Sequence, residues 1–385
     1  MKNIVCICMA VAVFPLICPG SAWATNDLAV RAEAYCLIDR NSGQFLAGKN
    51  ENEERPIASI TKIMTALTAV EYIQNLDENT QVSRNADQTA EYTAGLKEGQ
   101  VLSLREALKG ALIKSYNDTA VVLAEYVAGD EDFFAYLMTC KAFALGAVHT
   151  RFCNASGLPD PDRPQSSTAY EVAVLARQVL MNPVTASLVS SREVQFCHPG
   201  YKEPLSIHNT NPLLTVYPGA DGIKTGTADA SGKCLAVSAS RENQAFIAVV
   251  LHSSDRAGDG RKLLDYGFSA RPQEIMTTAE TIGNASTQEK KGISHPITLV
   301  PGKNVVVLQG NQQELEIQTR IQVQENMQAP VEAGQRVGQM QVWINHHYFS
   351  SVDVRSKQAV TAQKWVDHGI EWMMKRIYDQ LILIW

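Results

Sequence analysis

A serine and a lysine three residues apart, Ser59 and Lys62, are the first candidates for chemistry in this sequence. On a helix, residues three apart share a face, so the amine of Lys62 can reach the hydroxyl of Ser59. A serine becomes a nucleophile when a base takes its proton, and a lysine can be that base if burial or nearby positive charge lowers its pKa. Alone, the pattern also fits a helix start with a solvated lysine.

A second polar pair, Ser115 and Asn117, lies inside a mostly helical stretch predicted over 104–127. A hydroxyl and an amide at this spacing can relay a proton and hold the backbone of a substrate. By itself the pair fits equally a turn between two helices.

A third group, Lys224-Thr225-Gly226, precedes a region of apolar, β-prone runs. A cation and a hydroxyl on an edge strand can bind a substrate carboxylate, and Gly226 lets a ligand approach the backbone closely. An exposed strand start is the plainer interpretation. The order Ser-x-x-Lys, Ser-x-Asn, Lys-Thr-Gly is typical of penicillin-binding proteins and class A β-lactamases, and it makes the set more informative than any one motif.

The predicted elements place these motifs between two groups of strands. A hairpin comes first, helices follow after Pro56, and strands return from Gly232 before a last helix. This order predicts an α/β sandwich with one antiparallel sheet. The predicted ranges are 34–39 and 44–47 for the hairpin, 104–127, 131–145 and 168–181 for helices, 235–238 and 245–251 for strands, and 256–266 for the last helix.

The chain has 385 residues, which is too long for one compact domain. An apolar run after Lys2, ending in Ala22-Trp23-Ala24, predicts a secretory signal peptide over 1–24. The domain that carries the three motifs is expected over 25–272. Alternating apolar residues beyond it predict a small all-β domain over 273–358.

The last segment, 359–385, has apolar residues on one helical face, charged residues away from it, and three tryptophans. Its apolar run is too short and too interrupted to span a bilayer. We favour an amphipathic helix lying in the membrane surface over a helix packed on its own domain.

The net charge of −6 gives no reason to expect nucleic-acid binding. Five cysteines remain after signal-peptide cleavage, an odd number with no metal-binding spacing. Buried, apolar thiols are favoured over a disulfide framework. The five are Cys36, Cys140, Cys153, Cys197 and Cys234.

With these motifs the chain resembles the low-molecular-weight penicillin-binding proteins, the serine D-alanyl-D-alanine carboxypeptidases of peptidase family S11. The resemblance covers about 30–270, and the all-β domain and tail extend it over the mature chain. It implies a penicillin-binding, β-lactamase-like domain of helices around an antiparallel sheet. It rests on the segments 55–62, 115–118, 152–159, 167–169, 208–211 and 221–226.

The resemblance also implies roles for the first two motifs. Ser59 would attack the carbonyl of the penultimate D-Ala of a peptidoglycan stem peptide, with Lys62 as general base. Ser115 and Asn117 would relay protons and hold the substrate. The terminal D-Ala would leave, and water would hydrolyse the acyl-enzyme.

For the third motif the resemblance implies substrate binding. Lys224 and Thr225, beside Gly226, would bind the terminal carboxylate region, with Arg256 nearby. The backbone N–H groups of Ser59 and Thr227 would form the oxyanion hole. No metal or cofactor is implied, β-lactam antibiotics would be covalent inhibitors, and the enzyme would work at the outer face of the cytoplasmic membrane.

Two positions depart from the family pattern. Tyr116 replaces a commoner small residue in the second motif, and Ala228 stands where the family often has a threonine. Both bear on substrate fit or turnover, and neither removes a group that the mechanism needs.

Other activities share this machinery. A β-lactamase would carry a deacylating Glu-x-x-Leu-Asn loop, and none lies between Ser115 and Lys224. A non-catalytic wall-binding protein would not need the complete set of motifs. A D,D-endopeptidase or a transpeptidase stays open, because the acylation step is the same.

Overall fold

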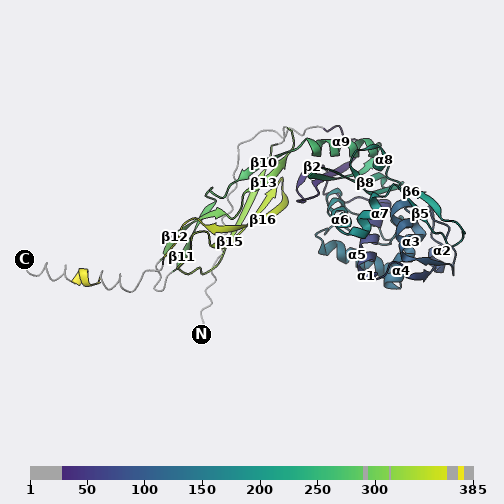
Figure 1. Cartoon of the computed structure of the whole chain (residues 1–385), viewed down its shortest axis with the longest axis horizontal. Coiled ribbons are helices and arrows are strands. Elements are labelled where there is room, and N and C mark those ends of the chain that lie inside the picture. The colour runs from purple at the N-terminus through teal and green to yellow at the C-terminus, as the bar shows by residue number, and fades with distance from the viewer. Residues whose placement is uncertain (1–27, 289–293, 312–313, 362–371, 377–385) are drawn as a thin grey trace, which may run out of the picture. The chain divides into compact units, whose positions relative to one another are not determined.

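The computed structural model describes residues 28–288, 294–311, 314–361 and 372–376. It divides at residue 271 into two compact units (Figure 1). The larger holds the described residues up to Arg271 and a short segment that begins at Leu308, and the smaller holds most of the rest. The predicted signal peptide and most of the predicted tail helix lie outside the described residues.

A five-stranded antiparallel sheet lies at the centre of the larger unit. Its strands, in spatial order, are β2 (Phe45–Lys49), β1 (Ala34–Asp39), β9 (Gln244–Ser253), β8 (Gly232–Arg241) and β7 (Ala220–Ala228). Two two-stranded ribbons lie outside it: β3 (Asn79–Gln81) with β4 (Val101–Ser103), and β5 (Glu193–Phe196) with β6 (Leu205–His208).

Both faces of this sheet are covered, because successive side chains of a strand point to opposite faces. On β1, Cys36 joins the larger hydrophobic core with the helical region, whereas Leu37 joins a second core with α9. Figure 1 shows α8 and α9 at one end of the larger unit and α1, α4 and α5 at the other. The predicted α/β sandwich with one antiparallel sheet is confirmed.

The helical elements of the larger unit come mainly between β2 and β7. They are η1 (Ala58–Thr61), α1 (Lys62–Tyr72), α2 (Arg84–Asp87), α3 (Leu104–Lys109), η2 (Gly110–Lys114), α4 (Asn117–Ala128), α5 (Glu131–Ala144), α6 (Ala169–Met181), α7 (Pro183–Ser190), α8 (Leu213–Val216) and α9 (Arg256–Ser269). Hydrogen-bonding N-caps fix several starts. Asp130 accepts from the Phe133 N–H at α5, and Thr168 accepts from the Glu171 N–H at α6.

Two details differ from the sequence predictions. The strands of the central sheet return at Ala220 rather than at Gly232, since β7 pairs with β8 along its whole length, and the ribbon strands before it were not predicted. Its mixed polar sequence hides a strand whose middle residues are nevertheless buried. All five cysteines are free, as favoured, but Cys140 and Cys197 are exposed, so the prediction of buried thiols is wrong for these two.

The smaller unit is mostly antiparallel β-structure. Its main sheet has the order β11 (Gly283–Gln288), β12 (Ser294–Pro301), β16 (His347–Ser356), β15 (Arg336–Ile344) and β14 (Ile317–Val323), and a ribbon pairs β10 (Arg271–Met276) with β13 (Val305–Gln309). The alternating pattern places Met340, Val342 and Ile344 in its core.

In the described part of the chain no single helix is long and apolar enough to cross a membrane. Only α6 and α7 taken together, bent by 104°, have the length and composition for it. Residues 372–376 form a short exposed helical segment within the predicted tail.

Candidate active site

The two residues of the first motif lie where η1 runs into α1. Ser59 belongs to the tight turn of η1, and Lys62 is the first residue of α1. The Lys62 Nζ lies 3.0 Å from the Ser59 Oγ, 2.6 Å from the Asn117 Oδ1 and 2.6 Å from the backbone oxygen of Ser156. The lysine is completely buried, whereas Ser59 is half-buried. A buried amine is thus in hydrogen-bond contact with an accessible hydroxyl.

The surroundings of Lys62 disfavour its charged form. Burial and the positive charge of Lys224 hold the pKa of Lys62 well below its ordinary value, while Asp118 and Glu131 act in the opposite direction. A lysine with a lowered pKa is unprotonated, and able to accept a proton, at a lower pH than a solvated one.

The second motif lies at a break between helices. The chain leaves η2, a π-helical turn, through Ser115, whose φ of 71° is in the left-handed region, and α4 begins at Asn117. Such a conformation is strained for a residue other than glycine, and strain of this kind gathers at functional sites. The break turns the Ser115 hydroxyl toward Lys224 and the Asn117 amide oxygen toward Lys62.

The loop preceding this motif is held by its neighbours. The Asn117 Nδ2 donates to the backbone oxygen of Glu91 at 3.1 Å, and the buried Asp118 carboxylate accepts from the N–H groups of Ala94, Gly95 and Leu96. These bonds fix Asn117 from behind, so its amide oxygen has a defined position toward Lys62.

The third motif lies in the middle of the edge strand β7. Lys224 is fully buried and donates to the Ser115 Oγ at 2.8 Å and to the Thr225 backbone oxygen at 3.0 Å. Burial, with a further contribution from the charge of Arg256, lowers the pKa of Lys224 to about 7. The Thr225 hydroxyl lies 2.6 Å from the hydroxyl of Thr210.

Two glycines allow the backbone around Ser59 to pack closely. A Cβ atom at Gly226 would lie 2.7 Å from the Ile57 backbone oxygen, and one at Gly157 would lie 2.1 Å from the Ala58 backbone oxygen. Gly157 also has a φ of +86°, which favours glycine. The turn carrying Ser59 is therefore packed between β7 and the loop after Phe152, with no room for a side chain at either glycine.

An exposed edge completes the arrangement. Arg256, at the start of α9, donates to the Thr227 Oγ1 at 2.9 Å and to the Gly226 backbone oxygen at 3.0 Å. Thr227 is exposed and Arg256 is partly exposed. Along β7 the side chains thus change from the buried Lys224 to the exposed Thr227 hydroxyl beside the Arg256 guanidinium. This series of hydrogen-bond donors and positive charges suits the anionic end of a ligand.

The structure thus brings the sequence-predicted residues into two groups, and Gly226 of the second packs against the turn that carries Ser59 of the first. One holds Ser59, Lys62 and Asn117, and the other runs along β7. The second contains Ser115, Lys224, Thr225, Gly226, Thr227 and Arg256.

Sequence reasoning did not assign the Ser156 backbone oxygen or the Thr210 hydroxyl to the site. Their segments, 152–159 and 208–211, were noted only as part of a resemblance. Every residue has a backbone oxygen, so the residue type does not show which one takes part in a site. The contact between the hydroxyls of Thr210 and Thr225 depends on two segments that meet only in the folded structure. Among the described residues, no cluster of three His, Cys, Asp or Glu side chains is arranged to hold a metal ion.

Comparison with known proteins agrees with this geometry. The family model described as D-alanyl-D-alanine carboxypeptidase matches residues 21–255. The chain belongs to the D-alanyl-D-alanine carboxypeptidase family. A second model, the C-terminal domain of penicillin-binding protein 5, matches residues 276–362. The family resemblance predicted from the motifs is confirmed.

Individual members of the family support the assignment. The chain is 31% identical to the D-alanyl-D-alanine carboxypeptidase DacF of Bacillus subtilis over 323 residues, which is 82% of each chain. Among solved structures, the carboxypeptidase DacD of Francisella tularensis aligns with a TM-score of 0.65 and 25% identity, covering 90% of this chain and 96% of its own. Penicillin-binding protein D2 of Listeria monocytogenes, solved in an ampicillin-bound form, aligns with a TM-score of 0.57 and 27% identity over 63% of this chain and 99% of its own.

Membership of the carboxypeptidase family decides the reaction class. The protein is a serine hydrolase of the D-Ala-D-Ala carboxypeptidase type, a penicillin-binding protein of peptidoglycan metabolism. Its catalytic domain and C-terminal β domain have the fold of penicillin-binding protein 5, which confirms the predicted penicillin-binding domain followed by a small all-β domain. The family match favours this activity over a β-lactamase and over a non-catalytic wall-binding protein.

Proposed function

We propose that Ser59 is the residue this carboxypeptidase acylates, that Lys62 is the general base, and that the substrate is a peptidoglycan stem peptide ending in D-Ala-D-Ala. The observation that carries the proposal is the 3.0 Å contact between the Ser59 Oγ and the amine of the fully buried Lys62. The positive charge of Lys224 adds to the effect of burial on Lys62. Together they favour the unprotonated amine that the proposed base needs in contact with the nucleophile.

The orientation of Lys62 supports the same role. An unprotonated amine has two N–H bonds and one lone pair. Two oxygens lie 2.6 Å from the Lys62 Nζ, the Asn117 Oδ1 and the backbone oxygen of Ser156, and they accept hydrogen bonds from the two N–H groups. The lone pair then points to the remaining neighbour, the Ser59 Oγ.

The proposed reaction follows from these positions. Lys62 takes the proton of Ser59 as its Oγ bonds to the carbonyl carbon of the penultimate D-Ala, and the oxyanion accepts hydrogen bonds from the N–H groups of Ser59 and Thr227. The intermediate collapses, the C–N bond breaks, and the proton held by Lys62 passes through Ser115 to the leaving D-Ala amine. Water then attacks the ester carbonyl with its proton going to Lys62. The bond from the carbonyl carbon to the Ser59 Oγ breaks, Lys62 returns the proton to Ser59, and the shortened peptide leaves.

Substrate binding is assigned to the residues along β7. Lys224 has both of its contacts inside the protein, so we assign it the supply of positive charge and the orientation of Ser115. The Thr225 hydroxyl and the exposed pair of Thr227 and Arg256 are placed to bind the terminal carboxylate. Asn117 holds the substrate backbone on the other side.

The assignment of Ser59 is tested by incubating the protein with labelled penicillin and with a D-Ala-D-Ala pentapeptide. We expect one label on the peptide containing Ser59, located by mass spectrometry, and release of free D-Ala. Both should be lost in Ser59→Ala and kept in Ser190→Ala, which changes an exposed serine of α7. Labelling that persists in Ser59→Ala would refute the assignment. Release of D-Ala with transfer of the acyl peptide to an added amine acceptor, in place of hydrolysis, would indicate a transpeptidase. The ampicillin-bound form of the Listeria relative supports penicillin as the probe.

We also propose that the protein is exported through the signal peptide over 1–24 and is held at the outer face of the cytoplasmic membrane by 359–385. The amphipathic pattern of this tail supports the proposal, and Trp372 is 61% exposed in the described helical segment. Deletion of 359–385 should release the protein from membranes in a flotation assay while penicillin labelling continues. Unchanged flotation of the truncated protein would rule out the tail as the anchor.

A further inference from the structure

The loop from Phe152 to Pro159 supplies the Ser156 backbone oxygen to Lys62, although it contains no helix or strand. Backbone in such a loop keeps its position only if neighbouring groups hold it. The Ser156 oxygen lies within 2.6 Å of the Lys62 Nζ. The groups that hold this loop therefore determine where one of the two N–H acceptors of Lys62 lies.

Within the loop, the Gly157 N–H belongs to the same peptide unit as the Ser156 oxygen and donates to the Asn154 Oδ1 at 2.7 Å. The preceding residue, Ala155, is held from outside on both sides. Its oxygen accepts from the Thr65 Oγ1 of α1 at 2.6 Å, and its N–H donates to the Glu131 Oε1 of α5 at 3.0 Å.

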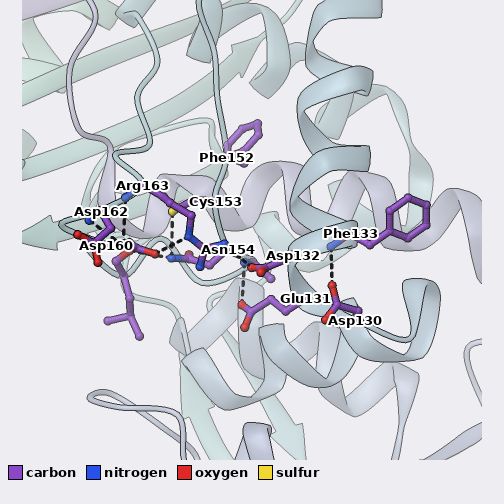
Figure 2. Close-up of polar contacts among 12 residues, drawn as sticks. Asp130, Glu131, Asp132, Phe133, Phe152, Cys153, Asn154, Asp160, Asp162 and Arg163 are labelled. Atoms are coloured by element: carbon purple, nitrogen blue, oxygen red, sulfur yellow. Dashed lines mark hydrogen bonds and ion pairs between the residues drawn. The ribbon is translucent and has the colours of Figure 1, made fainter.

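Glu131 is well placed for this contact. It is the first residue of α5, directly after the N-cap Asp130, where the helix dipole favours a carboxylate. Figure 2 shows its carboxylate directed toward the loop that carries Asn154, while Asp130 turns to the Phe133 N–H. Asp132, the next residue, is instead paired with Arg163 at the surface. Three acidic residues in a row thus have three different partners.

Glu131 also acts on Lys62 electrostatically. The charged groups that face Lys62 are Lys224 from β7, Asp118 from α4 and Glu131 from α5; the cation lowers the pKa of Lys62 and the two carboxylates raise it. Burial raises the pKa of Glu131 itself, and the negative charges of Glu125 and Asp132 add to this increase. Hydrogen bonds from the Ala155 N–H and the Asn85 side chain lower the pKa of Glu131 in part. Asp118 is already committed to the loop before the second motif.

We propose that Glu131 is a positioning residue for acylation: by binding the Ala155 N–H it fixes the Ser156 oxygen that orients the Lys62 amine, and its charge balances part of the positive charge around Lys62. This role rests on the proposed function of Lys62 as general base. Glu131 acts through the loop and does not touch the substrate.

Two substitutions separate the hydrogen bond from the charge. Glu131→Gln keeps an oxygen acceptor for the Ala155 N–H but removes the charge, whereas Glu131→Ala removes both. Asp132→Asn is the matched control, because it removes one charge from the same helical turn at a solvent-exposed pair of little energetic weight. Asp130→Ala controls for a loosened start of α5, since it removes the N-cap without changing a contact to the loop.

The readout is the second-order rate of acylation by a fluorescent penicillin, measured as a function of pH. We expect Glu131→Ala to lower the rate by about 10- to 100-fold, as displaced reacting groups do. We expect Glu131→Gln to keep most of the acylation rate at high pH. We also expect it to move the acid limb of the pH–rate profile, where the rate falls as Lys62 is protonated, to lower pH. The sign follows because loss of a nearby negative charge destabilises the ammonium form of Lys62, so the unprotonated base persists at lower pH. Both control variants should follow the wild-type profile.

The results separate this inference from the proposed function. Wild-type profiles in both Glu131 variants, together with an inactive Lys62→Ala, would overturn the positioning role and leave the base in place. Full acylation by Lys62→Ala would overturn the proposed function instead. If Glu131→Ala does not fold, the acid limb of Glu131→Gln decides alone, since a purely structural role would not move it.

Discussion

The two units of this protein bury different kinds of side chain. In the larger unit, two lysines, Lys62 and Lys224, and several carboxylates such as Asp118 are almost completely inaccessible. In the described residues from 272 on, the buried polar side chains are Thr287 and Ser356 alone, and the remaining core is apolar. The larger unit contains ionisable groups where water is excluded, and the described part of the smaller unit has none among its buried side chains.

The contrast indicates what each unit is built to do. Burying an ionisable amine is unfavourable unless it is hydrogen-bonded, and it shifts the pKa of the group. The larger unit tolerates this for Lys62 and Lys224 because each has a set of oxygen partners. The smaller unit gains its stability from strands whose apolar side chains alternate toward one core. Changes to these two kinds of core should therefore affect different measurements.

The largest effect is expected at Lys62. Lys62→Ala should lower the acylation rate by about 10²- to 10⁴-fold, the usual contribution of a general base. The measurement is the rate of labelling by a fluorescent penicillin, with circular dichroism to show that the fold persists. Lys97→Ala, at an exposed lysine paired with Asp87, is the control. Equal rates in the two variants would contradict a special role for the buried amine.

A smaller effect, on stability alone, is expected in the core of the β unit. Met340 is fully buried on β15 between Ile321 and Val352 of the neighbouring strands. Met340→Ala should lower the free energy of unfolding of this unit by about 2–5 kcal/mol, as measured by scanning calorimetry. The exposed neighbour, changed in Gln339→Ala, serves as the control. Penicillin labelling at Ser59 should not change, and a loss of labelling would show that the two cores are not independent.

The smallest effect is a pH dependence from Lys224. Its pKa is lowered to about 7, so above that pH the amine loses the positive charge that we propose attracts an anionic substrate end. We expect kcat/KM for D-Ala-D-Ala peptides to fall above pH 7 by about two- to fivefold in all, because the Arg256 guanidinium still attracts the carboxylate. A peptide ending in D-alaninamide lacks the carboxylate and should show a flatter alkaline limb. Identical limbs for the two peptides would argue against Lys224 as the source of the charge.

Much of the fold could be predicted from the sequence, because the information is local. The strand over 34–39 coincides with β1, and the helices predicted over 131–145 and 168–181 coincide with α5 and α6 to within one residue at each end. Apolar periodicity and capping residues specify such elements directly. The strand β7 was missed over 220–228 because its sequence has no apolar run, and its burial comes from the packing of η1 and β8 against it.

The candidate site could be predicted only as far as side chains identify it. Ser59, Lys62, Ser115, Asn117 and Lys224 follow from motifs and are brought together by the fold. The order of the motifs says nothing about the Ser156 backbone oxygen, whose role is set by the path of a loop. The left-handed conformation of Ser115 was also beyond prediction, because it arises from tertiary contacts across a break that the helical pattern does not show.

The close packing around Ser59 restricts how this enzyme can evolve. Gly157 and Gly226 admit no side chain, so we expect a mutation at either position to displace the turn that carries Ser59, the proposed nucleophile. Heritable variation in inhibitor susceptibility or in substrate preference must then arise at positions that have space, such as Tyr116, Thr210 or Thr227. We therefore expect antibiotic selection to change residues at the rim of this site rather than the two glycines at its centre.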